Sequence, residues 1–368
     1  MMISVYRPKM LVLMTLEDKN YIPRHKAGIF FRTATILLFV GGMVCSCAKP
    51  NKLVEIKGEA QGTFYSIKYL SEEANPPLNK FYFDNLFASI DSSLSIYKPY
   101  SLVNKFNDGD SILTNDPWFI QMVLQSDKVY HESNGAFDPS VVHLVNAWGF
   151  GPDSKSYGAD VPIDSLLRIS GWDKVDFEIL SDGRMLIKKK VKGIKIGFNA
   201  IAQGYASDII AERLEQSNIK DYLIDAGGEL RASGFNQNGE IWKIGIDKPV
   251  ALQYSREIVA VIPLENASVA TSGSYRKYYE VDGVKYSHAI SPKTGRPVDH
   301  SLLSVTVITD SCSLADAYAT AIMIMGLDEG KEFLIDHPEI DAYLVYSDPS
   351  GELQSYTTQG IKEALKEL

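Results

Sequence analysis

The sequence predicts an α+β fold, a single domain of mixed, largely antiparallel sheets with packed helices. Strand-like and helical segments follow one another without the regular strand–helix–strand rhythm that builds a parallel sheet. Hairpin signals recur, for example the Ser-Asp-Gly turn at 181–183 and the Asp-Gly pair at 282–283. There is no fixed-period repeat and no low-complexity tract, which argues against solenoids and propellers.

The spacing of apolar residues predicts the individual elements. Helical spacing is expected where apolar residues recur every three to four positions, as at Phe83, Leu86, Phe87 and Ile90. The four segments of this kind are 81–94, 118–133, 200–214 and 314–325, the last ended by Gly326. Alternating or short apolar runs predict strands. These are 54–58, 64–69, a hairpin at 177–190, a strand and glycine turn at 221–234, then 242–247, 258–263, a hairpin at 278–286, 303–308, 344–345 and 353–356.

The first 47 residues predict a secretory signal of the lipoprotein type. A basic stretch at 24–32 precedes an apolar run at 33–44 that is too short to span a bilayer comfortably. The Val-Cys-Ser-Cys sequence at 44–47 resembles the bacterial lipoprotein cleavage box, so Cys47 is expected to carry the lipid. A plain signal peptide and an uncleaved anchor are the alternatives. We expect a protein that is lipid-anchored to a bacterial membrane and faces the periplasm or the cell exterior.

The remainder is expected to consist of a tether at 48–55 and one domain at 56–368. Apolar residues make up 45% of the chain and charged residues 23%, as in ordinary globular proteins. The formal net charge of −9 argues against nucleic-acid binding, which needs clustered Lys and Arg. After cleavage before Cys47, Cys312 is the one thiol left, so no internal disulfide is expected.

Asp316 and Thr320 form the most specific local pattern. They stand four residues apart on an expected helix, so that both side-chain oxygens point from one face. A carboxylate and a hydroxyl suit a hard cation such as Mg²⁺, with water and substrate phosphates completing about six oxygen ligands. The alternative is structural, with Asp316 solvated and Thr320 bonding its own backbone.

Two further segments carry chemistry. The segment 197–208 places Gly and Asn just before a helix, whose free N–H groups favour phosphate. Taken alone it is a weak signal, because many helices start after a glycine for reasons of turn geometry. It is neither a Walker loop nor a GxGxxG motif. The segment 286–297 presents His288 beside a Ser-Pro-Lys-Thr-Gly turn. His288 suits a general base or a phosphate ligand, or it is a structural histidine.

Taken in order, eight segments resemble the FAD:protein FMN transferase family, also known as the thiamine-biosynthesis lipoprotein family. They span essentially the whole chain after the signal, which makes the resemblance more specific than any single motif. The segments are QGTFYSIKY (61–69), SIYKPYSLVNKFN (95–107), GAFDPSV (135–141), FNAIAQGYASD (198–208), DAGGELRASG (225–234), SGSYRKYY (272–279), SHAISPKTGRPV (287–298) and SCSLADAYATAIMIMG (311–326).

The resemblance implies which residues would bind FAD and Mg²⁺. The metal would lie on Asp316, Thr320 and the backbone carbonyl of Ala200. His288 would have a catalytic or phosphate-orienting role. The flavin-side contacts would come from Gln61, Tyr97, Ala136, Phe137, Asp138, Gln203 and Ile290. Three positions depart from the commoner family pattern and put some FAD contacts in doubt, namely Gly197, Gln203 and Ser291.

The implied reaction is Mg²⁺-dependent transfer of FMN from FAD to a threonine hydroxyl of a target protein, with release of AMP. The implied acceptors are proteins of membrane electron-transfer complexes that carry a motif resembling Asp-x-x-Ser/Thr-Gly-Ala-Ser/Thr. The first alternative is a Mg²⁺-dependent FAD pyrophosphatase that gives FMN and AMP. The second is a non-catalytic, lipid-anchored flavin-binding protein, against which Asp316 and Thr320 argue, because flavin storage needs no Mg²⁺ ligands.

Overall fold

The computed structural model describes residues 52–73, 76–153, 161–249, 257–274, 278–281 and 283–368. The expected signal, Cys47 and the first part of the tether lie outside the described residues. The described residues belong to one compact unit, Lys49–Leu368. Within these residues, no helix combines the length and the apolar character that crossing a membrane requires.

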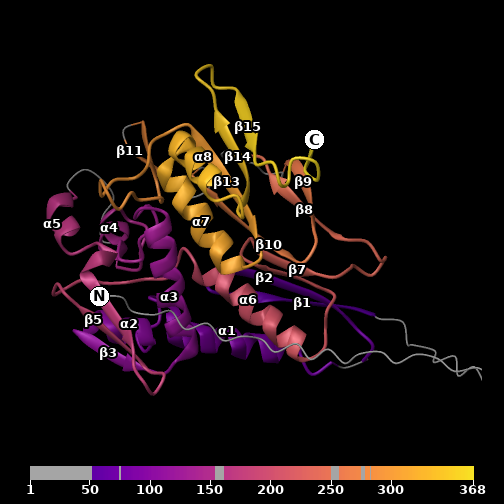
Figure 1. The fold of residues 1–368 in the computed structure, drawn as a ribbon, viewed down its shortest axis with the longest axis horizontal. Helices are drawn as coiled ribbons and strands as arrows, with labels where there is room; N and C mark the ends of the chain where they lie inside the picture. The colour runs from indigo at the N-terminus through magenta and orange to yellow at the C-terminus, as the bar shows by residue number, and fades with distance from the viewer. Residues whose placement is uncertain (1–51, 74–75, 154–160, 250–256, 275–277, 282) are drawn as a thin grey trace, which may run out of the picture. The chain divides into compact units, whose positions relative to one another are not determined.

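An eight-stranded antiparallel sheet organises this unit (Figure 1). Its order is β1-β2-β6-β7-β10-β13-β14-β15, and each neighbouring pair runs antiparallel. The strands are β1 (Lys52–Ala60), β2 (Thr63–Ser71), β6 (Tyr222–Ala226), β7 (Glu229–Ser233), β10 (Ala267–Gly273), β13 (Leu302–Thr309), β14 (Asp341–Ser347) and β15 (Leu353–Thr357).

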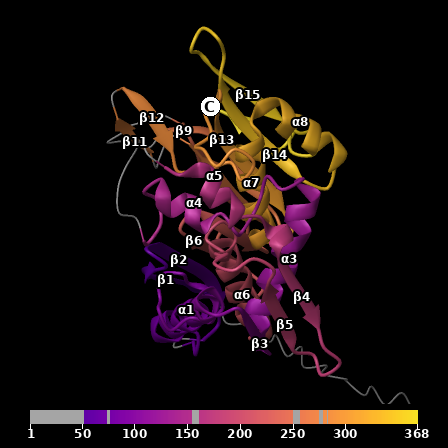
Figure 2. The same ribbon diagram turned by 90° about the vertical axis from the view of Figure 1, so that its left-hand side faces the viewer.

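Three smaller antiparallel groups accompany the main sheet. One sheet has the order β3-β5-β4 and lies at the far end of the unit from β14 and β15 (Figure 2). A second has the order β16-β9-β8, and β11 pairs with β12 as a hairpin. The bounds are β3 (Ser111–Thr114), β4 (Val175–Ile179), β5 (Met185–Lys189), β8 (Trp242–Asp247), β9 (Ile258–Leu264), β11 (Tyr278–Val281), β12 (Val284–Ser287) and β16 (Lys366–Glu367).

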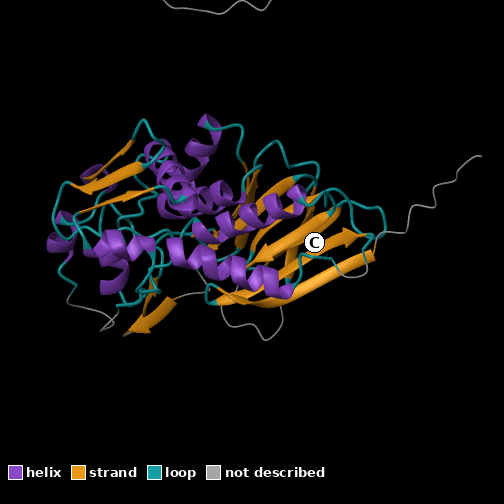
Figure 3. Cartoon of the chain, turned by 90° about the horizontal axis from the view of Figure 1, so that it is seen from below, coloured by secondary structure: helices purple, strands orange, loops and turns teal. Residues whose placement is uncertain are grey.

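Helices α1, α6 and α7 pack against the main sheet, and α3 packs on α1 and α7. Figure 3 shows helices gathered over the strands of the sheet. Side-chain caps mark where three of them begin, because Asn79, Asp116 and Ser311 each accept a backbone N–H of the first turn. The helices are α1 (Lys80–Leu94), α2 (Leu102–Asp108), α3 (Pro117–Glu132), α4 (Val142–Ala147), α5 (Ile163–Arg168), the short 3₁₀ turn η1 (Trp172–Lys174), α6 (Ala202–Gln216), α7 (Cys312–Met325) and α8 (Leu327–Asp336).

Side-chain alternation along the strands gives the sheet two cores. Val305 and Val307 of β13 face the helix-covered core, whereas Ile308 joins the core under β8 and β9. Neither core covers the outward side of β1 and β2, where Phe64 is 72% exposed. One end of the sheet therefore keeps an open face.

The α+β prediction is confirmed, with local corrections. Strand β1 begins at Lys52, so residues 52–55 of the expected tether belong to the sheet, where they pair with the end of β2. The segment 221–234 is a hairpin, because the glycine turn lies in its middle and β6 and β7 pair on either side. The helix expected at 200–214 begins two residues later, at Ala202. The elements that apolar spacing did not predict are α2, α4, α5, η1, α8, β3, β10 and β16.

Candidate metal and flavin site

Helix α7 presents the predicted metal pair from the core side of the sheet. Ser311 caps the helix by accepting the Leu314 N–H, and Asp316 and Thr320 follow one turn apart. Asp316 is only 8% exposed. Burial raises the pKa of this carboxyl group to about 7, and a hydrogen bond from the backbone of Gly204 opposes the rise. A buried carboxylate with so little compensation is a favourable place for a cation.

The Gly204–Asp316 hydrogen bond leaves the backbone carbonyl of Ala200 without its usual helical donor. In a regular helix the Gly204 N–H would reach the carbonyl four residues earlier, which belongs to Ala200. It donates instead to Asp316 Oδ2 at 3.3 Å. Across the described residues, no hydrogen bond ends on the Ala200 carbonyl oxygen. The Gly204 N–H thus links the Asp316 carboxylate to the segment that contains Ala200, whose carbonyl accepts no hydrogen bond from the described residues.

Thr320 is the third predicted oxygen ligand. Its hydroxyl lies 3.3 Å from the Ser272 hydroxyl on β10, so the strand orients the threonine side chain. Carboxylate, hydroxyl and carbonyl oxygens make a hard ligand set that fits Mg²⁺. Within the described part of the chain, no group of three His, Cys, Asp or Glu side chains could hold a metal. A Mg²⁺ ion on the three predicted oxygens would take its remaining ligands from a substrate or water, which is the expectation from the sequence.

Gly204 lets α6 and α7 approach each other closely. A Cβ atom at this position would lie 2.3 Å from the carbonyl oxygen of Cys312, closer than any non-bonded contact allows. Only glycine fits there. Cys312 itself is buried and free.

Two predicted flavin contacts, Gln61 in the β1–β2 turn and Gln203 at the start of α6, belong to segments that meet the turn between β6 and β7. A Cβ on Gly227 would meet both the Thr63 methyl group at 2.6 Å and the Gln203 amide at 2.8 Å. The Gln61 side chain hydrogen-bonds to Asp91 on α1, a carboxyl group whose pKa burial raises. The β1–β2 turn, the β6–β7 turn and the start of α6 are thereby adjacent.

Tyr97 is presented at the surface by the loop between α1 and α2. The side chain is 56% exposed, so a planar ligand can stack on it. The Asn104 amide holds the loop by donating to the carbonyls on both sides of Tyr97, Ile96 at 2.9 Å and Lys98 at 3.0 Å. Asn104 has no role in the sequence prediction, although it lies in the matched segment 95–107.

The predicted contacts at 136–138 are buried. Ala136 is 3% exposed and Phe137 2%, so their side chains pack in the core and only their backbone can reach a ligand. Asp138 accepts hydrogen bonds from the Ser140 N–H at 2.7 Å and the Trp172 N–H at 3.1 Å. Burial raises the pKa of Asp138. This carboxylate joins two turns of the fold, which is a structural role.

His288 and Ile290 belong to a separate apolar region around α4. Ile290 is 4% exposed and packs with Leu144 and Trp148. The His288 ring lies 6.2 Å from the Phe150 ring, edge to face. The indole N–H of Trp148 donates to the Gly295 carbonyl at 2.7 Å and so anchors the turn that follows His288.

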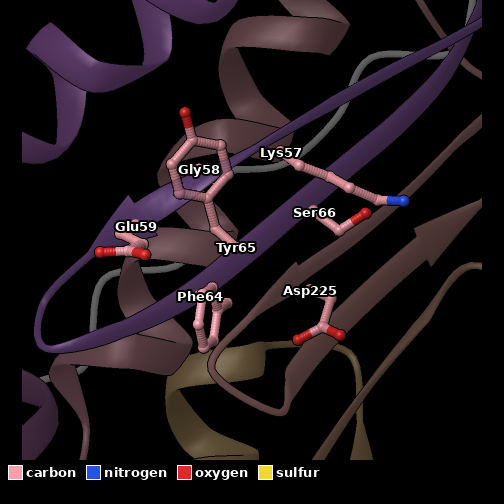
Figure 4. Close-up of a pocket in the computed structure, with 7 residues that line it drawn as sticks. All are labelled: Lys57, Gly58, Glu59, Phe64, Tyr65, Ser66 and Asp225. Carbon is pink, nitrogen blue, oxygen red and sulfur yellow. The ribbon is translucent and has the colours of Figure 1, made fainter.

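A separate cavity of about 450 Å³ lies on the open face of the sheet (Figure 4). The exposed ring of Phe64 and the carboxylate of Asp225 border it, and the Asp225 carboxylate also accepts the Gly228 N–H at 2.9 Å. None of the predicted metal or flavin ligands lines this cavity. We therefore do not assign it to the predicted site.

Comparison with known proteins decides the family. The ApbE family model matches residues 61–344. The chain belongs to the ApbE family. A curated relative, the FAD:protein FMN transferase of Vibrio cholerae, is 33% identical over 306 residues, or 81% of this chain and 87% of its own length. The enzyme of the same name from Escherichia coli K12 is 34% identical over 286 residues, covering 75% and 80%.

Solved ApbE structures share the fold. The flavin transferase ApbE from Vibrio cholerae superposes with a TM-score of 0.74 at 28% identity, covering 86% of this chain and 100% of that one. The apo form of the Pseudomonas stutzeri flavinyl transferase ApbE gives 0.74 at 29% identity, covering 85% and 97%. The predicted family, the predicted fold class and the predicted enzyme class, a transferase, are confirmed.

Within this ApbE fold, sequence reasoning missed three residues that organise the site. They are Gly204, whose lack of a side chain allows α7 to pack closely; Asp208, which accepts hydrogen bonds from the start of α7; and Ser272, which orients Thr320. All three lie in matched segments, 198–208 and 272–279, but none has a local pattern that reveals its partner on another element.

Proposed function

We propose that the chain transfers FMN from FAD to a threonine hydroxyl of a target protein, with Mg²⁺ bound at Ala200, Asp316 and Thr320 and with AMP released. The observation that carries this proposal is the pairing of a buried Asp316 carboxylate with an open Ala200 carbonyl through the Gly204 N–H. Storage of a flavin would not require that oxygen set. The names of the relatives support the FAD and FMN chemistry.

The residues of the chain would bind and orient rather than react covalently, because phosphoryl transfer depends mainly on positioning and on neutralising charge. A bound Mg²⁺ would offset the negative charge of the pyrophosphate. Gln61, Tyr97 and Gln203 would hold the flavin side. The acceptor hydroxyl would attack the FMN phosphorus, the bond to the AMP phosphate would break, and His288 is the candidate for receiving the hydroxyl proton or orienting the phosphate.

The test uses the chain from residue 48 onward, FAD, and a peptide with the Asp-x-x-Thr-Gly-Ala-Thr pattern. We expect the peptide to gain the mass of one FMN in the presence of Mg²⁺ and not without it, as read by mass spectrometry. A matched peptide with alanine in place of the acceptor threonine should gain nothing. AMP release without a mass gain would instead establish the pyrophosphatase, and FAD binding without either product would establish a flavin-binding protein.

The proposal includes a lipid anchor at Cys47, which would keep the enzyme beside acceptors of membrane electron-transfer complexes, on the periplasmic or outer side of a bacterial membrane. We expect Cys47→Ser to move the full-length protein from the membrane fraction to the soluble fraction after cell lysis, since a lipid chain supplies the hydrophobic attachment. Retention of Cys47→Ser in the membrane, together with release of Cys45→Ser, would place the cleavage site two residues earlier.

A further inference from the structure

Helices α6 and α7 meet along two matched rows of residues (Figure 1). Within a helix, a spacing of four puts residues on one face, about 6 Å apart along the axis. The row on α6 is Gly204 and Asp208, with Ala200 in the turn two residues before the helix, and the row on α7 is Thr320, Asp316 and Cys312. The contacts Gly204–Asp316 and Asp208–Cys312 show that the two helices run in opposite directions.

Asp208 holds the far end of this pair. Its buried carboxylate accepts the backbone N–H groups of Cys312 and Ser313, both at 2.9 Å. It also accepts the hydroxyl groups of Ser311 and Ser313, both at 2.9 Å. A carboxylate from α6 thus occupies the positive N-terminal end of α7, in a bonding pattern that fixes the helix along its own axis.

Arg231 on β7 fixes Asp208 in turn. Its guanidinium Nη1 lies 2.6 Å from Asp208 Oδ1, and the arginine side chain is 25% exposed. Three elements, α6, α7 and β7, therefore meet at one carboxylate. Because buried ion pairs add little net stability, we interpret the Asp208–Arg231 pair as fixing the positions of these three elements rather than as stabilising the fold.

We propose that Asp208 is a positioning residue for the metal site: by fixing the axial register of α7 against α6, it brings the oxygens of Asp316 and Thr320 to the Ala200 carbonyl. The proposal rests on the metal site of the proposed function. One residue of slippage moves a helix by about 1.5 Å, whereas Mg²⁺ requires near-octahedral oxygens at about 2.0–2.1 Å. A small loss of register would therefore weaken the metal site without unfolding the domain.

The test measures Mn²⁺ binding by electron paramagnetic resonance of the free ion, with the chain from residue 48 onward, in the presence and absence of FAD. We expect Asp208→Asn to raise the Mn²⁺ dissociation constant about tenfold or more, the range typical of lost outer contacts to metal ligands. The matched control is Asp116→Asn, because Asp116 also caps a helix, α3, by accepting a backbone N–H at 2.8 Å and a serine hydroxyl at 2.8 Å. Its dissociation constant should stay within about twofold of the original.

A second variant keeps the test decisive if Asp208→Asn does not fold. Ser313→Ala removes one hydroxyl that donates to the Asp208 carboxylate and leaves its charge in place, and we expect a rise in the Mn²⁺ dissociation constant that is smaller than the rise of about tenfold for Asp208→Asn. Folding is checked by circular dichroism. Unchanged Mn²⁺ affinity in a folded variant, an equal change in Asp116→Asn, or absence of Mn²⁺ binding by the original chain would each overturn the proposal. Mn²⁺ binding without FMN transfer would refute the proposed function alone.

Discussion

Asp316→Asn is expected to lower Mg²⁺-dependent FMN transfer by about 100-fold or more, because Lewis-acid stabilisation by a metal supplies several kcal/mol to a phosphoryl transfer. Asparagine keeps the shape of the side chain and an oxygen that can accept the Gly204 N–H, now bonded at 3.3 Å. It removes the negative charge that the metal requires. The measurement is the initial rate of FMN transfer against Mg²⁺ concentration.

Thermal unfolding separates this loss of metal binding from loss of the fold. Without metal, Asp316→Asn should be at least as stable as the original chain, because burying a carboxylate costs free energy. Adding Mg²⁺ and FAD should raise the melting temperature of the original chain and leave that of the variant nearly unchanged, since only a bound ligand stabilises the folded state. A variant with full activity would remove Asp316 from the site.

Gly204→Ala is expected to have the largest effect on stability. The new methyl group would lie 2.3 Å from the Cys312 carbonyl oxygen, a backbone atom that cannot move aside as a side-chain tip can. We expect a loss of about 1–3 kcal/mol in the free energy of unfolding, the usual result of overpacking, although alanine by itself favours a helix. The measurement is urea-induced unfolding.

The matched control for this variant is Gly330→Ala in α8. Its added methyl group would meet the Ile322 Cγ2 methyl at 2.8 Å, a longer contact than that at Gly204 and one made with a side-chain atom rather than with the backbone. The loss should therefore be smaller than for Gly204→Ala. Equal losses for the two variants would show that close approach of α6 and α7 is not the cause.

The sequence predicts the long helices and the metal pair because the information is local. Asp316 and Thr320 lie on one helix face by their spacing alone, and α1 and α3 show clear apolar periodicity. Strand β10 lacks a clear apolar pattern, because Ser268, Thr271 and Ser272 stand where apolar residues would mark a strand. The Thr271 hydroxyl instead hydrogen-bonds to the Thr306 hydroxyl on the neighbouring strand β13 at 2.9 Å. Such a strand is recognised only by its partners.

The remaining parts of the site depend on contacts between distant segments. Gly204 and Asp316 are 112 residues apart in the sequence, and no local pattern predicts that the N–H of one binds the carboxylate of the other. The same holds for Asp208 and its partners at the start of α7. Family resemblance, rather than spacing, led to Ala200, and the structure adds a physical reason in its open carbonyl.

The most direct test of the central claim is to locate the metal by crystallography, with Mn²⁺ in place of Mg²⁺ and with FAD bound. We predict one anomalous-scattering peak within about 2.5 Å of Asp316 Oδ, Thr320 Oγ1 and the Ala200 carbonyl oxygen, with pyrophosphate oxygens on its other side. A peak elsewhere in the molecule, with these three oxygens bonded only to protein or water, would contradict the account.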